Sequence, residues 1–128
     1  MDRMRVPTQA PWAKVVGYSR AVRVGNHVCV AGTAPVGEDG NIVAPGDAYL
    51  QARRCIEIIM SALQQAGARA EHVVRTRMFV RHPEMWEDVG RAHGEIFGAV
   101  QPATTMVFVD FIDPDMLVEI EADAIIDS

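Results

Sequence analysis

Residues 117–126 read LVEIEADAII, and this stretch decides the fold. A strand places successive side chains on opposite faces of its sheet. Here one face carries apolar side chains, and the other carries Glu119, Glu121 and Asp123. Neighbouring carboxylates in such a row lie roughly 6–7 Å apart, which is two strand rises. Like charges at this spacing repel one another, so the strand needs a cationic neighbour.

A second alternating stretch has the complementary charge. Residues 73–81 read VVRTRMFVR and place Arg75, Arg77 and Arg81 on one face. We predict that these two strands are neighbours, so that each carboxylate meets an arginine across the ladder. The pattern leaves two interpretations open. The charged face is either an ordinary solvated sheet face or a face that is partly enclosed when several copies associate.

Segments with helical spacing lie on both sides of the arginine-bearing strand. Asp47 is a candidate N-cap for a long helix, and Gly67 is expected to end it. A weaker helix is predicted over residues 84–98. Further strands are predicted at 104–111 and in a hairpin of 15–24 and 27–33. This order predicts an α+β fold in which parallel strands are joined by helical crossovers and two helices pack on one face of a mixed sheet.

Length and charge narrow the classes of function. The chain has 128 residues, the size of one domain, and we predict a single domain over residues 1–128. The net charge of −5 disfavours a nucleic-acid groove, which depends on surplus Lys and Arg. The N-terminal residues lack the apolar core of a signal peptide, and no stretch reaches the ~18 apolar residues of a membrane span. We therefore expect a cytoplasmic protein that binds neither nucleic acid nor membrane.

The cysteines and histidines form no pattern of metal ligands. Cys29 and Cys55 lie in apolar surroundings, and we expect both to be buried free thiols. The four histidines are scattered, and no Cys/His spacing is typical of a zinc site. His93 falls within the second predicted helix, where we expect it to pack as a structural side chain. We expect neither a metal nor a cofactor.

Several short stretches, in the same order along the chain, resemble the reactive intermediate deaminase family (Rid or YjgF-like, also called endoribonuclease L-PSP-like). The first runs from Gly17-Tyr18 to Pro35, and the second holds Gln51-Ala52-Arg53 in the long helix. The others are residues 73–80, Pro102-Ala103 and residues 118–122. No single stretch is diagnostic, but the ordered set covers nearly the whole chain.

The resemblance implies a chorismate-mutase-like fold and a homotrimer. In such proteins three sheets form a central barrel, the helices lie outside, and small metabolites bind in pockets between subunits. The last strand lies between the first block and the strand of residues 73–80, which agrees with the pairing expected from charge. Typical members hydrolyse 2-imino or enamine acids to the 2-keto acid and ammonia, and they need no cofactor.

The resemblance also implies roles for individual residues. Glu119 matches a catalytic glutamate that positions the attacking water. Six further residues match the family's substrate-binding positions: Tyr18, Ala31, Gly32, Gly90, Thr104 and Met106.

Four of these positions depart from the family's pattern. An arginine that grips the substrate carboxylate is replaced by Thr104, and a nearby cysteine is replaced by Met106. Ala31 lacks a hydroxyl, and Gly90 stands where a polar side chain is common. A bidentate arginine contact to a carboxylate is charge-assisted, and losing it costs roughly 2–3 kcal/mol of binding.

Two functions remain open from the sequence. The first is an imine or enamine hydrolase with altered substrate specificity, in which Glu119 still holds the water. The second is a trimeric metabolite-binding protein that has kept the fold and lost the reaction. A ribonuclease, a label also attached to this family, fits poorly with the net charge of −5.

Overall fold

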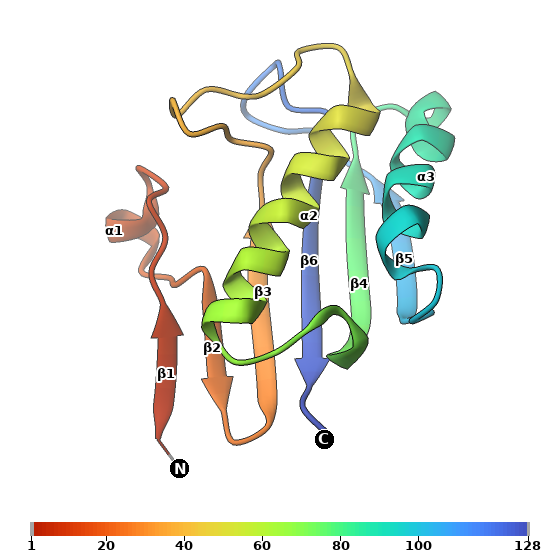
Figure 1. The fold of residues 1–128 in the computed structure, drawn as a ribbon. Helices are drawn as coiled ribbons and strands as arrows, with labels where there is room; N and C mark the ends of the chain where they lie inside the picture. The colour runs from red at the N-terminus through yellow and green to blue at the C-terminus, as the bar shows by residue number, and fades with distance from the viewer. Residues whose placement is uncertain (1, 128) are drawn as a thin grey trace.

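A computed structural model describes residues 2–127 and shows a six-stranded sheet in the order β1-β2-β3-β6-β4-β5 (Figure 1). The strands are β1 (Arg3–Val6), β2 (Ala21–Val24), β3 (His27–Thr33), β4 (Val73–Val80), β5 (Ala103–Phe108) and β6 (Val118–Ile125). The helices are α1 (Ala13–Val16), α2 (Ala48–Gln65) and α3 (Trp86–Phe97), with 3₁₀ turns at Ala70–His72 and Pro83–Met85.

The predicted pairing of the acidic and basic strands is confirmed. β6 runs antiparallel to β4, with Arg77 opposite Glu121. The Nη1 atom of Arg77 lies 3.1 Å from Oε1 of Glu121 and 3.5 Å from Oδ2 of Asp123. One arginine therefore neutralises two of the three carboxylates.

The expectation of an arginine for every carboxylate is wrong. Glu119 stands opposite Phe79 in the register of β4 and β6. Arg81 lies just past the end of β4 and turns away from the ladder, where it pairs with Asp110 and donates to the carbonyl oxygen of Met116. Glu119 is thus the member of the acidic row that stands opposite Phe79 of β4 instead of an arginine.

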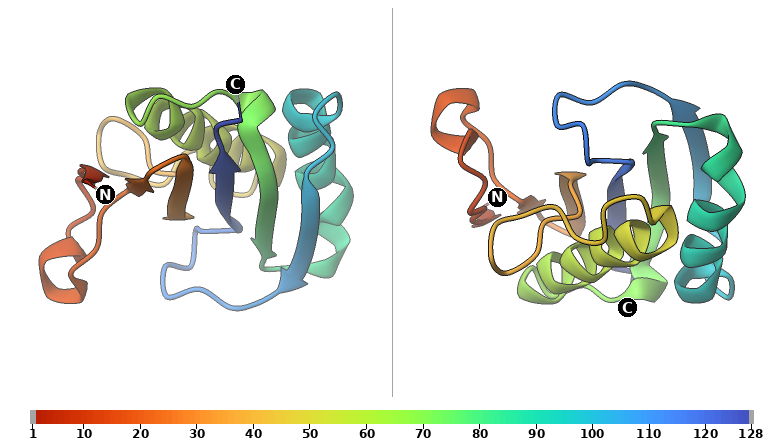
Figure 2. Two further views of the ribbon diagram at one scale, coloured as in Figure 1. Left: turned by 90° about the horizontal axis from the view of Figure 1, so that it is seen from below. Right: turned by 90° about the horizontal axis from the view of Figure 1, so that it is seen from above.

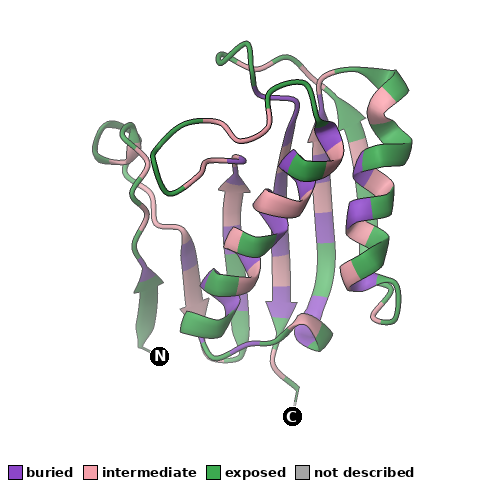
Figure 3. Ribbon diagram, turned by 45° about the horizontal axis from the view of Figure 1, so that its top comes forward, coloured by how far each residue is buried: buried purple, intermediate pink, exposed green. Residues whose placement is uncertain are grey.

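Both long helices cover the same face of the sheet, as predicted (Figure 2). α3 connects β4 to β5 as a crossover between parallel strands. The core lies between these helices and the sheet, where buried residues concentrate (Figure 3), and its largest buried side chains include Phe97, Ile56, Ile59, Leu63 and Ile120. The opposite face carries the charged rows, and we call it the open face.

The ends of α2 follow the sequence signals. The side chain of Asp47 accepts a hydrogen bond from the amide of Leu50 at 2.9 Å, as an N-cap does. Gly67 has a φ of 86°, the left-handed conformation that ends a helix. Within residues 2–127, no helix has the length and apolar character needed to cross a membrane.

The N-terminal region differs from the sequence prediction. Residues 15–20 do not extend the hairpin, because Ala13–Val16 form a short helix that ends at Gly17 with a φ of 82°. The unpredicted strand β1 pairs with β2 at the edge of the sheet. It has only four residues, of which Val6 is the buried one, too short a pattern to stand out in the sequence.

Cys29 is exposed, so the prediction that it is buried is wrong, whereas Cys55 is buried as expected. β3 alternates between its faces, and Cys29 stands opposite Asp123 on the open face. The apolar neighbours Val28 and Val30 point to the core instead.

Gln51 ties α2 to the segment that leads into β6. Its fully buried side chain donates to the carbonyl oxygen of Asp115 and accepts from the amide of Leu117, both at 2.8 Å. Gln51→Leu keeps the volume but leaves both backbone groups without this partner. We expect a loss of about 2–4 kcal/mol in the free energy of unfolding, since each stranded buried group costs roughly 1–3 kcal/mol.

Urea denaturation at one fixed protein concentration measures this loss. The matched control is Gln64→Leu, which changes an exposed glutamine of the same helix. Equal stabilities of the two variants would contradict the proposed role of Gln51.

Candidate functional site

A β-bulge interrupts the pairing of β3 with β6. Val30 stands opposite Ala122 and Thr33 opposite Ile120, so Ala31 and Gly32 together span the place of Glu121 alone. A bulge bends its strand and frees backbone groups from the ladder, and bulges are frequent beside functional sites. Ala31 and Gly32, two of the residues implied by the resemblance, form this bulge.

Arg20 holds the bulge in place. Its Nη1 atom donates to the carbonyl oxygen of Gly32 at 2.8 Å and to Oγ1 of Thr33 at 2.9 Å. Its Nη2 atom donates to Oγ1 of Thr8 at 3.1 Å. A charged donor therefore satisfies a carbonyl that the bulge removes from the sheet.

Gly32 and Glu119 are in close contact. A β-carbon built at Gly32 would lie 3.2 Å from both Cδ and Oε1 of Glu119, tighter than an ordinary van der Waals contact. The glycine therefore leaves the space that the carboxyl group occupies. The sequence prediction that these two residues share a site is consistent with this contact.

The surroundings of Glu119 raise the pKa of its carboxyl. Burial is the main cause, and repulsion by Glu121 adds to it, while the nearby charge of Arg20 acts in the opposite direction. A carboxyl with a raised pKa binds and releases a proton closer to neutral pH than an exposed one does. This property suits a general acid or base.

Tyr18 joins this cluster through Arg20. The guanidinium carbon of Arg20 lies 5.8 Å from the centre of the half-buried Tyr18 ring, within the range of a cation–π contact. Tyr18 also lines an open hollow of about 500 Å³ together with residues of the N-terminal segment, among them Arg5 and Lys14. We call Tyr18, Arg20, Gly32 and Glu119 the bulge group.

Thr104 lies in a second cluster, between β5 and α3. Its register places it beside Thr76 of β4, and the two Oγ1 atoms are 2.9 Å apart. Oγ1 of the buried Thr76 is 2.8 Å from Nε2 of His93 on α3. Oγ1 of Thr104 is also 3.1 Å from the carbonyl oxygen of Pro102. We call His93, Thr76 and Thr104 the threonine group.

His93 does more than pack. Its ring lies 4.9 Å from that of Phe97, a packing contact of the kind expected from the sequence, but the ring nitrogen also joins the hydroxyl chain. Burial lowers the pKa of His93 below its ordinary value, so the neutral imidazole predominates at pH 7.

Gly90 and Met106 complete the surroundings of the threonine group. Gly90 precedes His93 by three residues, so the two lie on neighbouring turns of one helix face. A β-carbon at Gly90 would meet nothing within 4 Å, so this surface is open. Met106 follows Thr104 by two positions on β5 and lies on the same face.

The bulge group and the threonine group cannot meet within one chain. The register aligns Thr104 and Thr76 with Ala122 on the helix-covered face of the sheet. The same register aligns Glu119 with Phe79 and Val107 on the open face. Because alternate residues of a strand face opposite sides, Glu119 and Thr104 are separated by the sheet itself.

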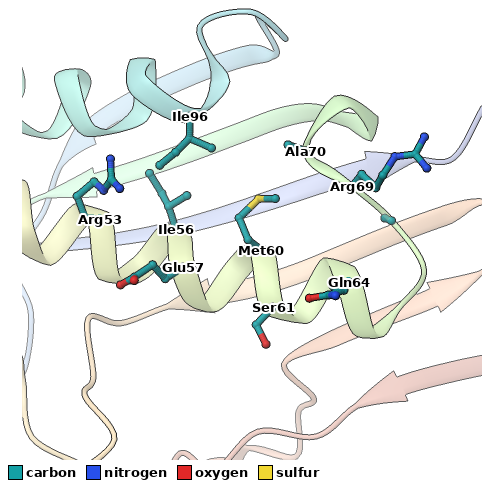
Figure 4. Close-up of a pocket in the computed structure, with 10 residues that line it drawn as sticks. Arg53, Ile56, Glu57, Met60, Ser61, Gln64, Arg69, Ala70 and Ile96 are labelled. Atoms are coloured by element: carbon teal, nitrogen blue, oxygen red, sulfur yellow. The ribbon is translucent and has the colours of Figure 1, made fainter.

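A further hollow lies away from both groups. A groove of about 570 Å³ separates α2 from α3 and the turn after α2 (Figure 4). Its walls include Met60 of α2 and Ile96 of α3, with Arg69 beyond the end of α2. None of the residues that the sequence marks as functional lines it. Among residues 2–127, no three His, Cys, Asp or Glu side chains gather closely enough to hold a metal ion.

Comparison with known proteins decides the family. The model of the endoribonuclease L-PSP family matches residues 8–126. The chain belongs to this family. It is the Rid family that the sequence resembles, and the matched region includes both the bulge group and the threonine group.

The similarity to individual relatives extends over most of this chain and most of each relative. An uncharacterised protein of Streptomyces coelicolor is 38% identical over 121 residues, which is 94% of this chain and 90% of the relative. The 3-aminoacrylate deaminase RutC of Acinetobacter baylyi is 32% identical over 103 residues, 80% of this chain and 82% of the relative. The crystal structure of a YjgF/YER057c/UK114 family member from Mycobacterium tuberculosis is 43% identical, with a TM-score of 0.87 over 98% of this chain and 100% of that one.

Three residues of these two groups are not among the site residues that the Rid resemblance implies: Arg20, Thr76 and His93. Thr76 gave a signal, because a hydroxyl on the otherwise apolar face of a strand needs a hydrogen-bond partner when it is buried. Arg20 gave no such signal, because the bulge that it contacts can be recognised only from the register of β3 and β6 in the structure.

Glu121→Gln is expected to lower the pKa of Glu119. The substitution removes the repelling charge of Glu121, and this favours ionised Glu119. Carbon-13 NMR titration of the glutamate carboxyls measures the shift. Glu57→Gln, on the exposed surface of α2, is the matched control. A pKa of Glu119 that stays the same or rises in Glu121→Gln would contradict the assigned cause.

Proposed function

We propose that the chain is a Rid-type hydrolase that converts an imine or enamine to the keto compound and ammonia, with a substrate specificity altered at Thr104. The observation that carries the proposal is the half-buried carboxyl of Glu119, with its raised pKa, seated against the glycine of a bulge. The similarity to a relative named 3-aminoacrylate deaminase supports the reaction class.

The reaction needs water and a group that carries protons. The Glu119 carboxylate takes a proton from water as the water oxygen bonds to the imine carbon, and it then gives this proton to the nitrogen. In the resulting carbinolamine, the hydroxyl proton passes to the nitrogen through the same carboxylate. The C–N bond breaks, ammonia leaves with the bonding electrons, and C=O forms. Water is the only co-reactant, so the atoms balance without a cofactor.

We further propose that the complete site forms between subunits of a homotrimer. One chain bears the bulge group on the open face and the threonine group on the covered face, so a second copy is needed to bring the two together. Apolar side chains are available for such a contact. Val107 and Phe108 at the β5 edge are 41% and 49% exposed, and Ile125 is 43% exposed on the open face.

The side chain of Thr104 supports the proposal that the substrate specificity is altered. Its hydroxyl can form hydrogen bonds but carries no charge to match a carboxylate. The same replacement, together with the missing hydroxyl at Ala31, favours the second candidate, a metabolite-binding protein of this fold without catalysis. The role of Glu119 distinguishes the two candidate functions, since a protein that only binds its ligand does not need a proton transfer by Glu119.

Ammonia release from freshly generated imines tests the reaction. Wild type is expected to be active, and Glu119→Gln is expected to lose about 100-fold or more in kcat, the usual contribution of a general acid or base. Glu57→Gln is the matched control, because it removes an exposed carboxylate of α2 that is not placed in the site. Thr104→Arg is expected to raise kcat/KM for 2-imino carboxylates.

The outcomes separate the candidates. Ammonia release at equal rates in wild type and Glu119→Gln would contradict the catalytic role of Glu119. No ammonia release from any variant, combined with measurable ligand binding, would support the binding protein.

Sedimentation tests the assembly. The protein is expected to sediment with three times the 14.0 kDa mass of the chain. Val107→Lys places a charge in the proposed contact and is expected to dissociate the assembly. Leu50→Lys is the matched control, because Leu50 is 49% exposed on the outer helix α2. A monomeric wild type, or equal effects of the two lysines, would contradict the proposed contact.

A further inference from the structure

The threonine group is a continuous chain of hydrogen-bonding atoms that runs from inside the fold to the surface. It begins at the half-buried ring of His93, passes through the fully buried hydroxyl of Thr76 and ends at the exposed Thr104. Both hydroxyl links lie within 2.9 Å. Its outer end stands where the Rid family's pattern expects the group that grips the substrate.

The chain has two possible directions, because each hydroxyl has one proton to donate. In the first, Nε2–H of His93 donates to Thr76, Thr76 donates to Thr104, and Thr104 donates to the carbonyl oxygen of Pro102. In the second, Thr104 donates to Thr76 and Thr76 donates to an unprotonated Nε2. The neutral form of His93 admits both directions, since its proton can sit on either ring nitrogen.

The direction decides what Thr104 offers to a ligand. In the first direction the Thr104 proton can turn from the Pro102 carbonyl to a ligand, so that the hydroxyl acts as a donor. In the second direction the Thr104 proton is donated to Thr76, so that the lone pairs of Thr104 accept a hydrogen bond from the ligand. An end that donates or accepts, without charge, matches a neutral polar group and matches a carboxylate poorly.

We propose that the site takes an imine or enamine whose second polar group is an uncharged carboxamide, and that His93 and Thr76 are positioning residues that set the direction of the Thr104 hydroxyl. A carboxamide carries both a carbonyl acceptor and an NH₂ donor, so it can pair with Thr104 in the direction that His93 and Thr76 set. A carboxylate has acceptors only, so it can pair with Thr104 only where the hydroxyl donates. The proposal rests on the proposed function for the reacting end of the substrate, and it adds the class of group at the other end.

A matched pair of stable keto compounds tests the recognition without any turnover. Pyruvamide and pyruvate differ only in carboxamide against carboxylate, and calorimetry or ligand-observed NMR measures the Kd of each. Wild type is expected to bind pyruvamide about tenfold more tightly than pyruvate. Failure to bind pyruvamide, or equal or tighter binding of pyruvate, would overturn the proposal.

Variants test the chain itself. Thr76→Val and His93→Phe interrupt it with little change of shape, and each is expected to lower the ratio of the two affinities toward one. His93→Gln keeps a side-chain amide near Thr76 and is expected to restore part of the preference. The matched control is Thr105→Val, which removes the neighbouring hydroxyl from the opposite face of β5. An unchanged ratio in Thr76→Val would overturn the role of the chain.

A spectroscopic readout separates positioning from mere structural support. In protein with nitrogen-15-labelled histidine, pyruvamide is expected to shift the Nε2 signal of His93 in wild type, and this shift is expected to vanish in Thr76→Val. A His93 signal that does not respond to saturating pyruvamide would contradict the positioning role.

Binding and turnover can fail independently. Selective pyruvamide binding without ammonia release from any imine would support the proposed carboxamide recognition and contradict the proposed hydrolase activity. Ammonia release with a preference for carboxylates would support the hydrolase activity and contradict the carboxamide recognition.

Discussion

Arg77 lies between Glu121 and Asp123, and the rest of the structure depends on the strand pairing that this arrangement makes possible. Without a cation, the acidic row of β6 would repel itself at the centre of the sheet. With Arg77 in place, β6 can lie between β3 and β4, and its apolar side forms the floor of the core. Each of these partly exposed ion pairs contributes little by itself, and the alternation of apolar and charged residues on β6 fixes the register.

The register in turn determines which acidic residue has no arginine of β4 opposite it. Glu121 and Asp123 share one arginine, whereas Glu119 faces Phe79 and the bulge of β3. The same row therefore contains two carboxylates paired with Arg77 and, at Glu119, a carboxyl whose pKa is raised by burial. Their chemical type and spacing are alike, and Glu119 differs in its burial beside the bulge and in having no arginine of β4 opposite.

The sequence was informative where a periodic pattern extended over several turns or strand residues. The alternation in β4 and β6 predicted their pairing, and Asp47 and Gly67 predicted both ends of α2. Prediction failed where a few local contacts outweigh the pattern. Residues 15–20 alternate, yet Gly17 ends a short helix there, and β1 is too short to be recognised. The contact of Gly32 with Glu119 could be expected from the family resemblance, but Arg20 and the link from Thr104 to His93 required the register and the side-chain packing.

The separation of the two groups by the sheet has a genetic consequence. With the site shared between subunits as proposed, a chain damaged at Glu119 still carries an intact threonine group, and a chain damaged at Thr104 still carries an intact bulge group. Where two such chains are neighbours in a mixed assembly, the intact bulge group of one chain and the intact threonine group of the other together form one complete site. Two alleles that are each inactive alone therefore complement one another when both are expressed in the same cell.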